Sequence, residues 1–258
     1  MNAIICMKQV PDTETRFQVR DGKIVEEGIQ YVVNPYDEYA IEECLLKKEA
    51  AGEGQVTVIC LGSERAREAI LQALALGCDQ AIHLDDPAFG AADAFVTAQV
   101  LAAAIKKVGA YDFVFTGKQG VDHDNAQVGI LLAEMLDLPH VSVVTRLEIG
   151  DGKATAQREV EGGKQVVATP LPAVFSAQKG LNEPRYPSFR GIRQAKSKPY
   201  TTWTAADLGL DPAALVPKSE LVSVTLPPER GGGKVIGGEP AEAAKELVRL
   251  LREEAKVI

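Results

Sequence analysis

Apolar runs alternate with amphipathic segments over the first half of the chain. Near-continuous apolar stretches predict buried strands at 3–10, 55–61, 80–84 and 111–115. Apolar residues at helical spacing predict helices at 35–51, from Ser63 to Gly77, at 91–108 and at 122–136. Buried strands that alternate with helices are typical of a parallel sheet covered on both faces. The pattern therefore predicts an α/β fold with a doubly wound, mostly parallel, Rossmann-like sheet.

The pattern changes after Pro139. Short alternating segments predict strands at 141–147, 154–160, 165–168 and 173–177, and the turn GDGK separates the first two. The earlier pair Asp21–Gly22 predicts a short β-hairpin inserted after the first strand. Residues 227–238, with the sequence PPERGGGKVIGG, predict a turn-rich linker before a last helix at 240–256.

From Pro199 onward the chain contains little core-forming sequence. A segment that is poor in apolar residues does not bury a core alone. We therefore expect one α/β domain over residues 1–190 and an extended C-terminal arm over residues 191–258 that packs on another chain.

Composition narrows the class of protein. The 258 residues are 46% hydrophobic, which suits one large domain with an appendage, and the net charge of −8 argues against a nucleic-acid partner. No Cys-x-x-Cys spacing occurs, so we expect buried thiols, a reducing compartment and no metal site. We also expect a cytoplasmic protein without direct membrane insertion, because neither a signal-peptide core nor a membrane-length apolar run is present.

The unusual loop follows the apolar stretch 111–115 and has the sequence TGKQGVDHDNAQVG (116–129). Gly117 and Gly120 allow a close approach of the backbone to a ligand, and Lys118 supplies a positive charge. Asp122 and Asp124 would repel an adjacent phosphate, so they are better suited to backbone N–H groups or ribose hydroxyls. No GxxxxGK[ST] or GxGxxG motif is present. The residues favour a small-nucleotide site over a well-capped turn.

The segment VVNPYDEYAIEE begins a predicted helix at the same edge of the sheet. Asn34 is expected as its N-cap, Pro35 at its first position and Asp37 in its first turn, which also describes an ordinary helix start. No catalytic residue is predicted, because His123 is the only histidine in the loop and no nucleophile elbow or Cys–His pair is evident.

Together these segments resemble the β subunit of electron-transfer flavoproteins. The resemblance spans nearly the whole chain through KQVPD (8–12), VNPYDEYAIEE (33–43), GKQGVDHDNAQVG (117–129), EGG…LPAV (161–174) and LNEPRY (181–186). It implies a heterodimer in which this subunit binds a structural AMP and the α subunit holds most of the FAD site. It also implies electron transfer from acyl-CoA and related dehydrogenases, as in fatty acid oxidation, to a quinone oxidoreductase.

The resemblance also implies the site residues. The nucleotide-binding residues it implies are Cys6, Asn34, Pro35, Tyr36, Asp37, Leu61, Gly117, Lys118, Gln119, Gly120, Val121, Asp122, His123, Asp124, Asn125, Ala126, Gln127, Val128 and Gly129. The implied partner-recognition loop comprises Leu181, Asn182, Glu183, Pro184, Arg185 and Tyr186. We expect Leu181 to be an exposed apolar anchor, and the alternative is a turn with a buried leucine. Basic residues from Arg185 to Lys198 would meet an acidic partner.

Two alternatives remain open from the sequence. Some relatives are electron-bifurcating and hold a second FAD in the AMP position, with a loop that tends to contain DGDT. Here the same positions are Asp122-His123-Asp124-Asn125, and the larger His123 favours AMP, whereas the following AQVG is similar to the bifurcating group. An adenine-nucleotide hydrolase is the other alternative, but CMKQVPD stands where such enzymes carry an SGG-rich loop.

Overall fold

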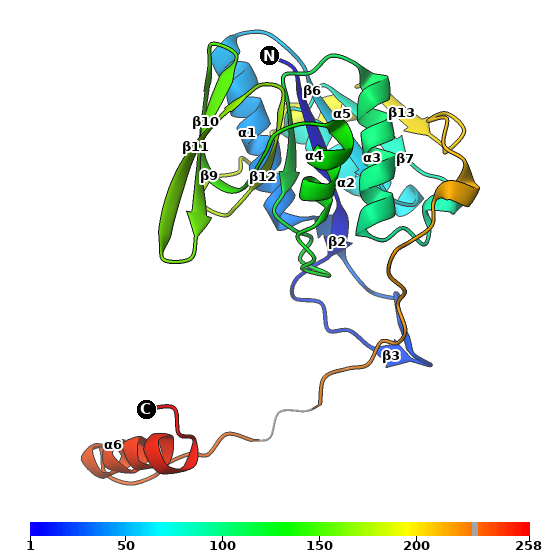
Figure 1. Ribbon diagram of the computed structural model, residues 1–258. Coiled ribbons are helices and arrows are strands. Elements are labelled where there is room, and N and C mark those ends of the chain that lie inside the picture. Colours follow the sequence, from blue (N-terminus) through cyan, green and yellow to red (C-terminus); the bar gives the residue numbers. More distant parts are fainter. Residues whose placement is uncertain (229–231) are drawn as a thin grey trace. The chain divides into compact units, whose positions relative to one another are not determined.

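A nine-stranded sheet forms the centre of the computed structural model, which describes residues 1–228 and 232–258 (Figure 1). Its strand order is β11-β10-β9-β12-β8-β1-β6-β7-β13. The strands are β1 (Ala3–Met7), β6 (Val56–Leu61), β7 (Gln80–Leu84), β8 (Phe113–Gly117), β9 (His140–Gly150), β10 (Lys153–Val160), β11 (Gly163–Pro170), β12 (Ala173–Ala177) and β13 (Tyr200–Trp203). Neighbours from β9 to β13 are parallel, and β10 and β11 are antiparallel. The predicted doubly wound α/β fold is confirmed.

Helices cover both faces of the sheet. One face carries α1 (Pro35–Ala51) and α2 (Arg67–Leu76), with α5 (Phe189–Ala195) packed on α2. The other face carries α3 (Ala94–Val108) and α4 (Val128–Leu136). Successive strand residues enter opposite cores: Ile5 packs with the α1 and α2 cluster, and Ile4 packs with the α3 and α4 cluster. The strands are continuous apolar runs because both faces are buried.

Several predicted boundaries differ from the structure. The strand expected at 3–10 is divided into β1 and β2 (Gln9–Pro11), and β2 pairs instead with β5 (Tyr31–Val33) in a separate two-stranded sheet. The helix expected from Asp122 begins only at Val128. Asp124 and Ala126 have φ values of 52° and 51°, which are left-handed conformations that a helix cannot contain.

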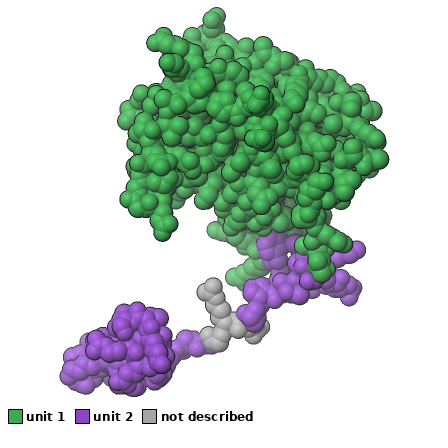
Figure 2. Space-filling model, in the orientation of Figure 1, with its two compact units in different colours: residues 1–16, 26–222 green, residues 17–25, 223–258 purple. Residues whose placement is uncertain are grey.

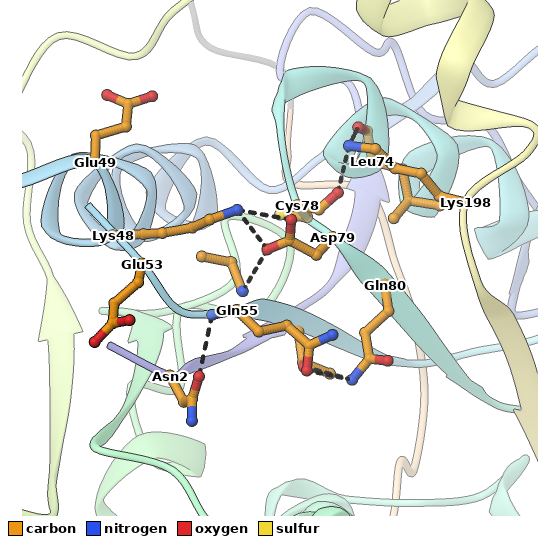
Figure 3. Close-up of polar contacts among 12 residues, drawn as sticks. Asn2, Lys48, Glu49, Glu53, Gln55, Leu74, Cys78, Asp79, Gln80 and Lys198 are labelled. Carbon is orange, nitrogen blue, oxygen red and sulfur yellow. Dashed lines mark hydrogen bonds and ion pairs between the residues drawn. The ribbon is translucent and has the colours of Figure 1, made fainter. Parts of the chain in front are cut away.

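At the amino ends of the strands a polar network joins α1, α2 and the sheet (Figure 3). Asp79 accepts hydrogen bonds from Lys48 Nζ at 2.6 and 2.7 Å and from the backbone N–H of Val56 at 2.7 Å. Lys198 Nζ donates to the carbonyl oxygens of Leu74 and Cys78 at 2.8 and 2.6 Å. A lysine at the carbonyl end of a helix stabilises its unpaired C=O groups. The network therefore ties the end of α2 to the start of β13.

A second compact unit contains residues 17–25 and 223–258 (Figure 2). The predicted hairpin is confirmed as β3 (Val19–Arg20) and β4 (Lys23–Ile24), joined by Asp21 and Gly22 at φ values of 52° and 72°. The last helix is α6 (Pro240–Arg249), which continues as a π-helical turn, Leu250–Glu254. The predicted linker 227–238 includes residues 229–231, which lie outside the described residues.

Residues 191–222, which the sequence assigns to the arm, belong to the first compact unit. The reason is β13, which extends the main sheet by pairing with β7, while Trp203, Leu208 and Leu210 pack against the core beneath α3. Among the described residues, no helix combines the length and the apolar content that a membrane crossing needs.

Candidate nucleotide-binding site

The topology changes direction beside β1. From β1 the chain proceeds through α1 and β6 toward β7, whereas β8 returns on the opposite side of β1. In doubly wound sheets, ligands bind beyond the carboxyl ends of the strands at such a switch point. Here that position is formed by the residues after β1, the end of β8 and the beginning of α1.

Asp37 joins these three elements. Its side chain is 4% exposed, with Oδ2 accepting from the backbone N–H of Lys8 at 2.7 Å and Oδ1 from that of Gly117 at 2.9 Å. Burial raises the pKa of Asp37 from 3.8 to about 7, although the hydrogen bonds from Lys8, Asn34 and Gly117 oppose this rise. A Cβ at Gly117 would collide with Asp37 Oδ1 and lie 2.8 Å from the Cβ of Tyr36, so this position needs glycine.

Asn34 holds the loop that follows β8. Its position before α1 is the predicted one, but its side chain does not cap the helix. Instead Nδ2 donates to the carbonyl oxygen of Gln119 at 2.8 Å, and Oδ1 accepts from the backbone N–H of Val121 at 3.1 Å. Asn34 is 1% exposed, so these two hydrogen bonds replace contacts of its amide with water and hold the loop.

The middle of the loop contains an ion pair. Lys8 Nζ lies 2.6 Å from Asp122 Oδ2, and His123 Nδ1 lies 3.1 Å from the same oxygen. Burial raises the pKa of Asp122, but the hydrogen bond and charge of Lys8 outweigh it and place the pKa below the usual range. Gln119 Nε2 donates to Asp124 Oδ1. Both carboxylates therefore have partners: Asp122 pairs with the Lys8 ammonium, and Asp124 accepts from the Gln119 amide.

The site fits a nucleotide phosphate at the beginning of α4. No side chain caps this helix, so its first N–H groups have no side-chain acceptor. Helix N-termini of this kind bind phosphate. Cys6 and Leu61, at the ends of β1 and β6, belong to the core on the same face as α4 and offer an apolar surface beside the loop. The structure thus brings the predicted nucleotide residues to one edge of the sheet.

A separate group of potential metal ligands, Glu64, His83 and Asp85, lies outside the loop. His83 is buried away from the loop, with Nε2 2.8 Å from the Gly62 carbonyl oxygen and Nδ1 2.8 Å from the Tyr200 hydroxyl. Glu64 and Asp85 lie near enough to His83 to resemble a metal cluster, but both imidazole nitrogens are already hydrogen-bonded. The four cysteines are buried and unpaired, as expected from the sequence.

The predicted partner-recognition loop lies elsewhere, against α1. Asn182 Nδ2 donates to Glu43 Oε2 at 2.9 Å and to the Tyr39 carbonyl oxygen at 3.0 Å. Arg185 forms ion pairs with Glu42 at 2.8 Å and with Glu49 at 2.6 Å. The loop is therefore anchored to α1 by its polar side chains, and the two glutamates that bind Arg185 were not identified from the sequence.

The expectation that Leu181 is exposed is wrong. It is partly buried and packs against the core beneath α1 and α2, because the bonds of Asn182 draw this part of the loop onto α1. The exposed apolar side chains follow it: Tyr186 is 95% exposed, Phe189 is 91% exposed, and Ile192 on α5 is also exposed. Their spacing of three residues, within a polar and basic stretch, is the sequence signal that could have identified them.

The fold and its switch point define a doubly wound, Rossmann-like α/β protein. A model of the family described as "Electron transfer flavoprotein domain" matches residues 21–208. The chain is 44% identical to the electron transfer flavoprotein subunit beta of Bacillus subtilis, with both chains covered completely. It is 40% identical to the same subunit of Syntrophomonas wolfei, covering 100% of this chain and 98% of the relative. It is also 39% identical to the caffeyl-CoA reductase-Etf complex subunit CarD of Acetobacterium woodii, covering 98% of each. The chain belongs to the electron transfer flavoprotein family.

Proposed function

We propose that this chain is the β subunit of a heterodimeric electron transfer flavoprotein and that the loop after β8 holds AMP as a structural ligand. The observation that carries the AMP site is the uncapped start of α4, which follows a glycine loop tied to the switch point by Asn34 and Asp37. AMP supplies no redox chemistry. It stabilises the folded chain because a ligand that binds only the folded state shifts the folding equilibrium.

Different residues of the chain are proposed to contact the phosphate and the adenine of AMP. The N–H groups of Val128 and Gly129 would hold the phosphate, and Cys6 and Leu61 would offer apolar surface to the adenine. The Lys8 ion pair with Asp122 removes the repulsion that a free carboxylate would exert on a phosphate. The glycines of the loop leave its backbone accessible to the ligand.

The redox cofactor belongs mainly to the α subunit in this proposal. FAD bound there would carry electrons from acyl-CoA dehydrogenases and related dehydrogenases to a quinone oxidoreductase. The chain is then a cytoplasmic electron-carrier subunit, and not an enzyme in its own right. Full-length similarity to named β subunits supports the assignment. The exposed Leu247 and Val248 of α6 offer an apolar face for a partner subunit.

The α-subunit partner is tested by truncation. Deleting the residues after Pro228 removes α6 and is expected to abolish heterodimer formation and flavin retention. The melting temperature of the α/β unit should stay nearly the same, because its core is separate from residues 223–258. A truncated chain that co-purifies with a flavin-bearing partner at full yield would contradict the role of the arm.

Dehydrogenases are proposed to dock on residues 186–193, at the end of the loop that lies against α1. Tyr186, Phe189 and Ile192 expose apolar surface beside Arg190 and Arg193, which suits an acidic partner with an apolar pocket. Phe189→Ser should weaken apparent dehydrogenase affinity about ten- to a hundredfold, since burying such a side chain is worth roughly 1.5–3 kcal/mol.

Leu181→Ala is the matched comparison for Phe189→Ser. It should lower the melting temperature and leave dehydrogenase kinetics nearly unchanged, because Leu181 packs on the core. Slow electron transfer with an unchanged melting temperature in Leu181→Ala would instead support the leucine anchor expected from sequence.

A second redox-active FAD in place of AMP is the alternative for the site. The similarity to CarD, a subunit of a caffeyl-CoA reductase-Etf complex, supports this second-FAD alternative. The deciding experiment is mass spectrometry of the small molecules released by denaturing the purified heterodimer. One AMP and one FAD per heterodimer supports the proposal. Two FAD and no AMP selects the alternative, and turnover of ATP would favour the hydrolase.

A further inference from the structure

The end of β7 holds a histidine whose two hydrogen bonds differ in kind. His83 Nε2 lies 2.8 Å from the Gly62 carbonyl oxygen, and Nδ1 lies 2.8 Å from the Tyr200 hydroxyl. A carbonyl oxygen only accepts, so Nε2 carries the proton and, in the neutral ring, Nδ1 carries the lone pair. Burial raises the pKa of Tyr200, so its hydroxyl stays protonated near pH 7 and donates to Nδ1. The ring is therefore fixed with Nδ1 as its acceptor.

Two carboxylates lie beside this imidazole. One ligand atom each of Glu64, His83 and Asp85 lies within 4.8 Å of the other two. Glu64 begins the short 3-10 helix after β6, and Asp85 directly follows β7. The two strands are parallel neighbours, with Leu61 opposite Leu84, so the segments that follow them meet at the carboxyl edge of the sheet. Strand pairing therefore brings the three side chains together.

Both carboxylates are available to a cation. Asp85 is partly exposed and forms no ion pair with any of the described residues. Glu64 Oε1 lies 4.0 Å from Arg67 Nε, and the Glu64 side chain is 76% exposed. An exposed ion pair of this length contributes little to stability, so Glu64 can exchange it for a closer cation. The two negative charges of the carboxylates balance a divalent cation.

The mixed set of donor atoms selects the kind of cation. Imidazole nitrogen suits Zn²⁺ and other transition metals, whereas Mg²⁺ and Ca²⁺ prefer oxygen ligands alone. A histidine that binds a metal usually donates its other ring N–H to a carboxylate or a backbone carbonyl, as His83 does to Gly62. Ligand atoms around a tetrahedral zinc lie roughly 3.3 Å apart, so rotation of the exposed Glu64 side chain is enough to close the site. A cation at Nδ1 displaces one neutral hydrogen bond, that of the Tyr200 hydroxyl.

We propose that Glu64, His83 Nδ1 and Asp85 form a Zn²⁺ site in which water takes the fourth position. Zinc bound by three protein ligands and a water is a common arrangement. The ion joins the segment after β6 to the end of β7, and because it binds only the folded chain it raises the melting temperature. None of the three residues is assigned to the nucleotide, to the α subunit or to dehydrogenases, so the site goes beyond the proposed function.

The test is titration of the metal-free, full-length chain with Zn²⁺ by calorimetry, in wild type, Asp85→Asn and Glu64→Gln. Glu68→Gln is the matched control, because Glu68 is an exposed glutamate of α2 that lies outside the group. We expect one zinc per chain in wild type and in Glu68→Gln, and at least about tenfold weaker binding in the other two variants. Zinc should raise the melting temperature in the same order. If Asp85→Asn misfolds, the exposed Glu64→Gln decides alone.

NMR of the imidazole rings tests the nitrogen ligand separately. The chain has three histidines, and zinc should shift the ring signals of His83 while those of His123 and His140 stay in place. His123→Gln and His140→Gln assign the three sets of signals without any change at the site. Wild type that binds no zinc overturns the proposal, as do Asp85→Asn and Glu64→Gln variants that bind zinc like wild type. Unshifted His83 signals, or Mg²⁺ that binds as tightly as Zn²⁺, would likewise overturn it.

Discussion

The two ends of the sheet are built differently, although both contain a buried or half-buried aspartate. At the amino end, Asp79 is paired with Lys48 and also accepts from the Val56 N–H. At the carboxyl end, Asp37 is buried, and its carboxylate accepts from the backbone N–H groups of Lys8 and Gly117. One aspartate is neutralised by a lysine, and the other remains with a raised pKa of about 7.

The difference shows where the chain keeps unpaired hydrogen-bonding groups. The amino end satisfies its groups with lysines and helix ends, which favours stability. The carboxyl end has an uncapped helix, left-handed Asp124 and Ala126, and a buried Thr116 hydroxyl without a hydrogen-bond partner. Backbone strain and unpaired buried groups of this kind concentrate at ligand sites. Substitutions at the amino end should therefore change stability only, whereas those at the carboxyl end should change binding as well.

The largest effect is expected for Gly117→Val. A Cβ at this position collides with Asp37 and approaches the α1 backbone at Tyr36, so the whole switch point must move. We expect a loss of about 4 kcal/mol or more in the free energy of unfolding, together with loss of bound nucleotide. Chemical denaturation measures the first and mass spectrometry the second.

Gly150→Ala is the control for Gly117→Val, because its added Cβ would meet nothing within 4 Å. It should change stability by no more than about 0.5 kcal/mol. A Gly117→Val protein that is as stable as Gly150→Ala would show that the carboxyl end is not closely packed.

Asp37 should make stability depend on pH. Its folded pKa of about 7 is above the unfolded value of 3.8, so the folded state binds more protons between these values. The contribution of Asp37 therefore favours folding less and less as the pH rises from about 4 to about 7. The full difference corresponds to roughly 4 kcal/mol as an upper limit.

Denaturation midpoints of wild type and Asp37→Asn between pH 4.5 and 8 measure this contribution. The stability advantage of wild type over Asp37→Asn should be largest at the acid end and shrink toward pH 7. A difference that grows with pH would mean that the carboxylate is stabilised in the folded state.

Asp79→Ala should have a smaller effect that is confined to stability. It removes the acceptor of the Lys48 ammonium and of the Val56 N–H at the amino end of the sheet. We expect a loss of about 1–2 kcal/mol with nucleotide content unchanged, because the removed bonds are partly exposed. Loss of nucleotide in this variant would contradict the separation of the two ends.

Gly120→Leu should affect stability least when no ligand is present. Its Cβ would lie 2.6 Å from Asp122 Oδ1 and 3.4 Å from Lys8 Cδ, both on side chains that can move. We expect a loss of AMP and of the stability that AMP provides, with a change of about 1 kcal/mol or less in ligand-free protein. Melting curves with and without added AMP separate the two effects, and unchanged AMP content would count against the loop.

The sequence alone determined the class of fold and the place of the candidate site. Continuous apolar strands that alternate with amphipathic helices have few other arrangements, so the parallel sheet followed from the pattern. The Asp-Gly turns at 21–22 and 151–152 also have left-handed φ values, as their residue types require. These features were predictable because they depend on local conformation and on the periodicity of burial.

Only the tertiary structure decided what the individual polar side chains do. The Asn34 side chain does not cap α1 but donates a hydrogen bond to the Gln119 carbonyl oxygen. Arg185 binds glutamates of α1 that lie more than a hundred positions earlier in the chain. Leu181 is partly buried because Asn182 is hydrogen-bonded to α1, whereas Phe189 is 91% exposed. Ser142 of β9 and Ser176 of β12 line one cavity only because β9 pairs with β12. Such contacts join residues that are distant in sequence, and residue type and spacing do not encode which of them meet.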